Sequence, residues 1–242
     1  MSTAPAAAPR RAASVLVLRD DPFEVLMVRR NARQSFASAL VFPGGAVEPT
    51  DASEAWRTLV APDDLAAEER ALRIAALREV HEECGVFLGP LPKAAPASVD
   101  FRALAAQAGA PLALDRLVAF GHWITPAHRA KRFDTHFFLA RMPAGQQARA
   151  DGSETVALEW VSPAALLDQV ARGESQLLFP TLMNLKRLAE SDSVADAVDR
   201  ARMRKPFTVE PVLVPTEDGI EITIPEEAGY GETRFRVPPS TL

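Results

Sequence analysis

Short apolar runs separated by polar turn signals open the chain. Ser14 to Leu18 and Glu24 to Val28 are rich in Val and Leu, and Asp20-Asp21-Pro22 stands between them. This pattern predicts two β-strands joined by a tight turn. Further strands are expected at about 117–124, 132–140, 157–161, 209–214 and 219–224, with the last two forming a closing hairpin.

Other segments repeat apolar residues at helical spacing. The longest predicted helix runs from Leu65 to Cys84, with Asp63 or Asp64 as its cap, and ends at Gly85. The residues expected in its buried stripe are Leu72, Ala76, Val80 and Cys84. Shorter helices are expected at about 52–60, 101–108, 163–171, 180–190 and 194–203.

Composition is that of an ordinary globular protein. The chain has 242 residues, of which 48% are hydrophobic and 24% charged, and its net charge of −5 argues against nucleic-acid binding. No apolar run approaches a membrane span, so no membrane partner is expected. The single cysteine, Cys84, excludes an internal disulfide, which fits a cytoplasmic protein.

The domain organisation is interpreted as one domain with tails. Residues 1–13 are rich in Ala and Pro and are predicted to be a disordered tail. Residues 14–242 are expected to form a single domain, with a core at about 14–172 and a C-terminal extension at about 173–242. The extension carries little obvious chemistry and is interpreted as a binding wall or a homodimer contact.

Three carboxylates cluster near the end of the long predicted helix. Glu79, Glu82 and Glu83 are spaced i, i+3, i+4, which places them on one helix face. Arg78 alone cannot balance three negative charges, whereas a divalent cation would. Oxygen ligands of this kind suit Mg²⁺ or Mn²⁺, which also hold substrate phosphates.

These residues resemble the signature of Nudix hydrolases. The run from Arg78 to Val86 matches its second half, R-E-U-x-E-E-x-G-U (U aliphatic), and Phe42-Pro43-Gly44-Gly45 matches its entry. Asp51 replaces the expected Glu, and 26 residues separate it from Arg78 where the family has 7, an insertion of 26 − 7 = 19. We expect Asp51 to cap the helix at 52–60, for which Ser53 is the other plausible cap, and not to bind metal.

The insertion is similar to that of the coenzyme A diphosphatase branch of the family. The segment from Trp123 to Ala140 also resembles that branch's W-x-T-P…R-R-F-D-T-x-F-F pattern. The segment preceding Phe42 matches the coenzyme A motif only in part: Arg29 falls on its first Arg, but Gln34 and Ser38 depart from it.

The resemblance implies a Nudix α/β/α sandwich with a mixed sheet, plus the helical insertion and the C-terminal extension. It also implies hydrolysis of a nucleoside diphosphate linked to another group. Metal would be held by Glu79, Glu82 and Glu83 with a carbonyl near Gly44. Glu79 would also help deprotonate water, Arg78 would orient the glutamates, and Glu154 is the candidate additional base, with Glu159 as its competitor.

Coenzyme A or an acyl derivative is the preferred substrate. The alternatives are ADP-ribose, a dinucleotide or another nucleotide derivative, and a Nudix-like binding module without hydrolysis. Candidate substrate contacts are Arg29, Arg129, Lys131, Arg132, Trp123 and Phe133. The basic residues would hold phosphate and the rings would stack on adenine, although a solvated loop is the competing interpretation.

The histidines carry no clear signal. His122, His128 and His136 lack the helical H-x-x-x-H spacing, so a zinc site is not expected. Each is interpreted as a polar loop or strand residue.

Overall fold

A mixed sheet forms the centre of the molecule. The structure, a computed structural model, describes residues 7–30, 40–90, 100–150, 155–217 and 219–237. Strand order is β3-β2-β1-β6-β5-β8, with β4 beside β1 and β7 beside β2. The β1–β6 and β5–β8 pairs are parallel, and the others are antiparallel. The strands are β1 Arg10–Arg19, β2 Glu24–Arg30, β3 Leu40–Val41, β4 Gly44–Ala46, β5 Val118–Ile124, β6 Phe133–Arg141, β7 Thr155–Val161 and β8 Thr208–Val209.

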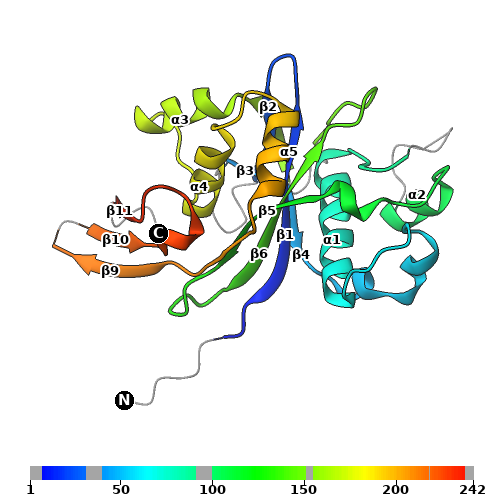
Figure 1. Cartoon of the computed structure of the whole chain (residues 1–242), viewed down its shortest axis with the longest axis horizontal. Coiled ribbons are helices and arrows are strands. Elements are labelled where there is room, and N and C mark those ends of the chain that lie inside the picture. The colour runs from blue at the N-terminus through cyan, green and yellow to red at the C-terminus, as the bar shows by residue number, and fades with distance from the viewer. Residues whose placement is uncertain (1–6, 31–39, 91–99, 151–154, 218, 238–242) are drawn as a thin grey trace.

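Helices cover both faces of this sheet (Figure 1). One core lies between the sheet and the α1/α2 layer, and the other lies under α3, α4 and α5. The bounds are α1 Ala67–Cys84, α2 Phe101–Gln107, α3 Pro163–Ala171, α4 Phe179–Leu188 and α5 Val194–Met203. Within the described residues, short 3-10 helices lie at Pro49–Ala52, Glu54–Thr58, Leu114–Arg116 and Glu226–Ala228. The expected α/β/α sandwich is thus confirmed.

Alternation along each strand explains how one sheet serves two cores. Leu26 and Val28 face α1, whereas Val25 and Met27 face the opposite helices. A strand buried on both faces must be apolar throughout, as β2 is over most of its length. The predicted hairpin is confirmed by the pairing of Leu18 with Val25.

The predicted disordered tail at residues 1–13 is wrong for residues 10–13. β1 begins at Arg10, so residues 10–13 belong to the sheet and not to a disordered tail. Ala12 and Ala13 pair with β4 on one side and with β6 on the other, and both are buried. Residues 1–6 lie outside the described residues.

Two other segments also differ from the expectation. Residues 52–60 form no α-helix, because 3-10 turns at Pro49–Ala52 and Glu54–Thr58 meet at Ser53. The expected strand at 209–214 is split. Val209 pairs with Trp123 in the main sheet, whereas β9 (Val212–Thr216) joins β10 (Gly219–Thr223) and β11 (Arg234–Val237) in a separate sheet. Pro211 lies at the break and has no N–H to donate.

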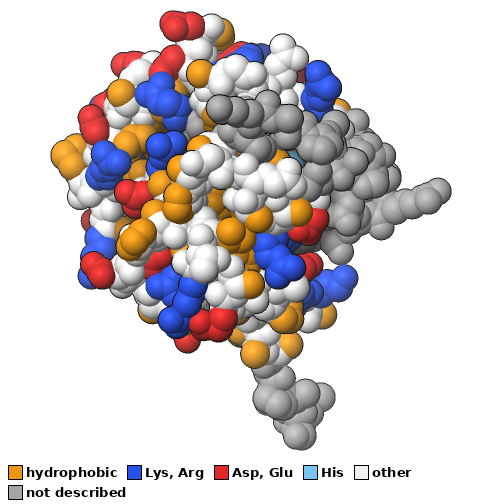
Figure 2. Space-filling model, turned by 90° about the vertical axis from the view of Figure 1, so that its right-hand side faces the viewer, with side chains coloured by type: hydrophobic (Ala, Val, Ile, Leu, Met, Phe, Trp, Pro, Cys, Tyr) orange, Lys and Arg blue, Asp and Glu red, His pale blue; other side chains and the backbone are white. Residues whose placement is uncertain are grey.

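The surface on the α1/α2 side carries charges of both signs. Figure 2 looks onto this face and shows acidic, basic and apolar side chains interspersed, with no extended basic area among the described residues. Within the same described part of the chain, the helices all fall short of the length and apolarity needed to cross a bilayer.

The end of α1 follows the expected glycine signal. Gly85 has φ 64° and ψ 14°, and its N–H donates to His81 O at 2.8 Å. An L-residue in this left-handed conformation costs about 1–2 kcal/mol. We therefore predict that Gly85→Ala lowers the free energy of unfolding by about 1 kcal/mol, measured by urea denaturation.

Gly109→Ala is the matched control, since a methyl group there meets open space and its φ is not positive. Its unfolding free energy should stay within about 0.5 kcal/mol of the wild-type value. Equal losses in the two variants would contradict the cap argument.

Candidate active site

The guanidinium of Arg78 organises the predicted carboxylate site. Its Nη1 donates to Glu79 Oε1 and Glu82 Oε2, each at 2.8 Å. Its Nε and Nη2 donate to the two carboxylate oxygens of Asp51, at 2.9 and 3.0 Å, and Nη2 also donates to Ala46 O at 3.1 Å. One side chain thus connects α1, β4 and the first 3-10 turn.

Burial and charge shape the protonation of this cluster. Burial alone would lower the pKa of Arg78, but its hydrogen bond to Asp51 and the charge of Glu79 outweigh that and raise it. Burial also raises the pKa of Glu79, and the charge of Arg78 only partly offsets this. A nearby cation stabilises the ionised form of a carboxylate whose ionisation is disfavoured by burial.

Glycines let the backbone of β4 approach the helix. Glu83 is buried and accepts a hydrogen bond from Gly44 N at 2.8 Å. A Cβ at Gly44 would collide with the backbone of Ala13, and one at Gly45 would collide with the carboxylate of Glu79. Gly44 therefore allows β4 to pair closely with β1, and the lack of a side chain at Gly45 leaves room for the Glu79 carboxylate beside β4.

The chemistry of the three glutamates suits a hard divalent cation, although within the described residues their carboxylates are not gathered within 4.8 Å of one another. Glu79 and Glu82 face the same guanidinium nitrogen, and the next residue on α1 is Glu83. Carboxylate oxygens supplied from one helix face suit Mg²⁺ or Mn²⁺. Glu82 is the most exposed of the three, with 48% of its side chain accessible, so a cation can reach the cluster from solvent.

Comparison with known proteins decides the family. Residues 8–180 match the NUDIX domain. The chain belongs to the Nudix family. It is also 30% identical to a solved structure of a NUDIX hydrolase from Alicyclobacillus acidocaldarius, with a TM-score of 0.64, over 79% of this chain and 96% of that one.

Curated relatives span most of the chain. A putative nudix hydrolase 7 of Caenorhabditis elegans is 28% identical over 91% of this chain and 74% of its own length. An acyl-coenzyme A diphosphatase of Homo sapiens is 27% identical over 87% of this chain and 73% of its own. That of Gallus gallus is 28% identical over 92% and 80%. The chain is a Nudix hydrolase.

The predicted capping role of Asp51 in this Nudix hydrolase is wrong. Its side chain does not cap the next helix; it accepts the N–H of Glu48 at 2.8 Å and pairs with Arg78 through both oxygens. Ser53 caps the second 3-10 turn by accepting from Ala55 N. Sequence reasoning missed the Asp51–Arg78 pair because the two residues are 27 positions apart in the chain.

Two predicted site residues lie near the β2–β7 pair. Arg29 Nη2 donates to Glu159 Oε1 at 2.6 Å, and each side chain is 38% exposed. By strand alternation both point to the face opposite α1, beside Met27. Glu159 is thus engaged in an ion pair, whereas Glu154 lies outside the described residues.

The candidate substrate residues around 123–133 separate into three groups. Trp123 is buried and its Nε1 donates to Tyr230 Oη at 2.9 Å, so its ring is not available to stack on a substrate. Arg132 donates to Thr125 O, Ala7 O and Glu210, and holds the loop in place. The other three, which are at least partly accessible, are Arg129, Lys131 and Phe133.

Strand pairing places side by side two histidines that are distant in the sequence. His122 on β5 lies opposite His136 on β6, and Asp134 lies beside them. Burial, and then the neighbouring His122, lower the pKa of His136 to about 4. Helical H-x-x-x-H spacing does not describe such a pair, because the two imidazoles meet across neighbouring strands.

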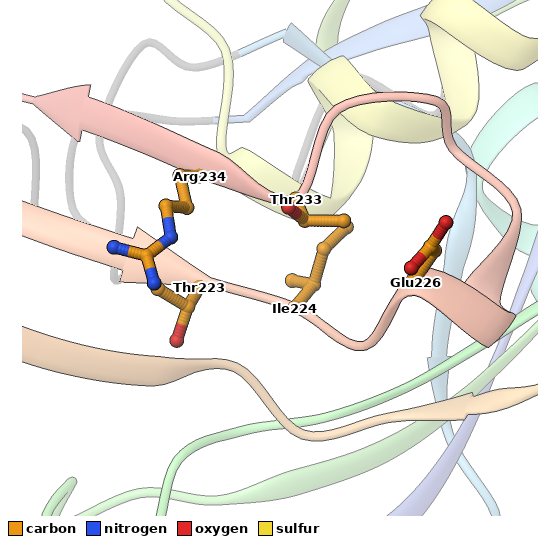
Figure 3. A pocket seen from close by; sticks show the side chains of 5 residues that line it. All are labelled: Thr223, Ile224, Glu226, Thr233 and Arg234. Carbon is orange, nitrogen blue, oxygen red and sulfur yellow. The ribbon is translucent and has the colours of Figure 1, made fainter.

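A shallow hollow of about 260 Å³ lies away from these groups. Thr223, Ile224, Glu226, Thr233 and Arg234 line it, and Figure 3 shows Arg234 and Glu226 at its two ends. None of the predicted site residues lines this hollow.

The ion pair of Asp51 leads to a stability prediction. Asp51 is 1% exposed, and removing it leaves a buried guanidinium without its main partner. Breaking such a pair costs about 3–5 kcal/mol, so Asp51→Asn should lower the unfolding free energy by that order in urea denaturation.

Glu54→Gln is the control, because Glu54 pairs with Arg57 on the surface, where both side chains are more than two-thirds exposed. Its effect should stay below about 1 kcal/mol. A loss of 1 kcal/mol or less in Asp51→Asn would contradict the importance assigned to the buried pair.

Proposed function

We propose that this Nudix hydrolase cleaves the diphosphate of coenzyme A or an acyl derivative, giving phosphopantetheine and adenosine 3′,5′-bisphosphate. The observation that carries the proposal is the match to acyl-coenzyme A diphosphatases over 87–92% of the chain. The run Lys131-Arg132-Phe133-Asp134-Thr135, which is similar to the R-R-F-D-T of that branch, supports it. ADP-ribose or a dinucleotide is the alternative substrate class.

Glu79, Glu82 and Glu83 would hold Mg²⁺ or Mn²⁺, with the carbonyl of Gly44 as a further ligand. When bound, the metal would neutralise phosphate oxygens and lower the pKa of water. Arg78 fixes the rotamers of Glu79 and Glu82 through one nitrogen, and so orients both carboxylates. Glu79, whose pKa is raised by burial, is the proposed proton acceptor, with Glu154 as the second candidate.

The 3′-phosphate distinguishes coenzyme A from most nucleotide diphosphates. Arg129 and Lys131 lie in the β5–β6 loop, whose frame is held by the contacts of Arg132. We assign the 3′-phosphate to these two side chains and a ring contact to Phe133. A turnover assay across coenzyme A, acyl-coenzyme A, ADP-ribose and dinucleotides tests the substrate class; turnover of ADP-ribose alone would overturn the proposal.

The first activity prediction concerns Glu83→Gln. The amide keeps an oxygen that can accept the N–H of Gly44, so the fold is retained while the negative charge is lost. We expect kcat at saturating Mg²⁺ to fall by about 10²–10³. Glu68→Gln, on the exposed first turn of the same helix, should keep the wild-type kcat; an unchanged rate in Glu83→Gln would refute the metal assignment.

The second activity prediction concerns the basic loop. An Arg129→Ala/Lys131→Ala variant should lose the preference for coenzyme A over dephospho-coenzyme A, mainly through KM. Losing these charged contacts should weaken the binding of coenzyme A by about 1.5–3 kcal/mol, or roughly 10–150-fold. Steady-state kinetics on both substrates measures it.

Lys205→Ala is the control, since it removes a positive charge from an exposed site outside this loop and should leave the preference unchanged. Equal use of the two substrates by the wild type would rule out the 3′-phosphate role.

A further inference from the structure

A second group of potential ligands lies outside the glutamate site. His122 on β5 stacks on His136 of β6, with ring centroids 3.8 Å apart and an angle of 25° between the planes. His136 Nε2 lies 3.6 Å from Asp134 Oδ1, and His122 Nε2 forms a short hydrogen bond with the same oxygen. All three ligand atoms lie within 4.8 Å of one another.

This set differs in chemistry from the three glutamates. Two imidazole nitrogens and one carboxylate oxygen form a ligand set that suits divalent transition metals such as Zn²⁺. At metal–ligand distances of about 2.0–2.1 Å, neighbouring ligands of a tetrahedral site lie roughly 3.3–3.4 Å apart. The 3.6 Å between His136 and Asp134 is close to that value.

A fourth residue forms a hydrogen bond with the other ring nitrogen of His122. Thr208 Oγ1, on β8, lies 2.7 Å from His122 Nδ1. The hydrogen bond from His122 Nε2 to Asp134 requires a proton on Nε2, since a carboxylate only accepts. An ion would displace that proton, and with Nδ1–H then donating to Thr208 the Nε2 lone pair would point to the cluster. Metal-binding histidines commonly have such a partner on the other ring nitrogen, because it fixes both tautomer and orientation.

His136 also presents a ring nitrogen to the cluster. Its Nε2 faces the same Asp134 oxygen as His122 Nε2 does, so both imidazoles present this nitrogen to one point. Between 18% and 24% of each of the three side chains remains accessible, so an ion can enter and water can complete its coordination.

The register of the sheet separates this cluster from the glutamate site. Gly45, Ala13, His136 and His122 form one row across β4, β1, β6 and β5. Gly45 faces Glu79 and Ala13 faces the α1 core, so the histidines lie on the same face of the sheet. With strands about 4.8 Å apart, the backbone of His136 lies roughly 10 Å from that of Gly45, too far for one ion to bridge both groups.

We propose that His122, Asp134 and His136 form a binding site for a divalent transition-metal ion such as Zn²⁺, distinct from the site of Glu79, Glu82 and Glu83. Thr208 positions His122 for this role. Since Thr208 belongs to β8, the bound ion also strengthens the attachment of the segment after α5 to the β5–β6 pair.

The test is a Zn²⁺ titration by calorimetry with excess Mg²⁺ present, so that the hard carboxylate site is already filled. The wild-type protein should bind one equivalent of Zn²⁺ at this site. A His122→Ala/His136→Ala variant should lose that equivalent, as should the milder His136→Gln variant, which keeps a polar side chain on β6. Thr208→Val should weaken Zn²⁺ binding by about 10–100-fold without abolishing it.

Two controls isolate the site. His128→Ala removes an exposed histidine of the neighbouring loop, and Glu83→Gln alters the other site; both variants should keep the Zn²⁺ equivalent. Circular dichroism melting without metal confirms that each variant is folded. Failure of the folded wild type to bind Zn²⁺, or equal binding by His136→Gln, would overturn the proposal and leave a hydrogen-bonded His–Asp cluster.

Discussion

The buried guanidinium of Arg78 is the interaction on which the active site depends. It joins three segments: the turn containing Asp51, the strand containing Ala46, and the helix containing Glu79 and Glu82. A planar group with five N–H donors can make these bonds at once, which an ammonium cannot. The 3-10 turn that precedes the insertion is therefore attached to the carboxylate site through the Asp51–Arg78 pair.

That arrangement brings several carboxylates around one guanidinium. Asp51, Glu79, Glu82 and Glu83 supply four carboxylates against one guanidinium, a net charge of −3 when all are ionised (1 − 4). Asp51 pairs with Arg78 through both of its oxygens, while Glu79 and Glu82 share the remaining terminal nitrogen of the guanidinium. The Asp that stands where the family has Glu thus has a structural role in holding Arg78.

Several elements followed from local signals. The helix ending at Gly85 and its buried stripe of Leu72, Ala76, Val80 and Cys84 are confirmed, as are the hairpin around Asp20-Asp21-Pro22 and the helices at 163–171 and 194–203. Helical periodicity, the terminal glycine and turn residues act within a few positions along the chain, so they can be read from it directly. The predicted cap of the long helix is wrong, because its N-cap is Ala66, which makes no side-chain cap, and not Asp63 or Asp64.

The sequence by itself determined the family signature, the helix with its three glutamates, and most of the strands. Only the tertiary structure decided which polar groups meet. Asp51 reaches Arg78 across 27 residues, His122 meets His136 across a strand pair, and Trp123 is buried by Tyr230 from 107 residues away. Such partners are set by sheet register and by packing between layers, which no local period specifies. Burial also decides the roles of these residues. Asp51, which was expected to cap a helix, forms a buried ion pair, and Trp123, which was expected to stack on a substrate, packs in the core.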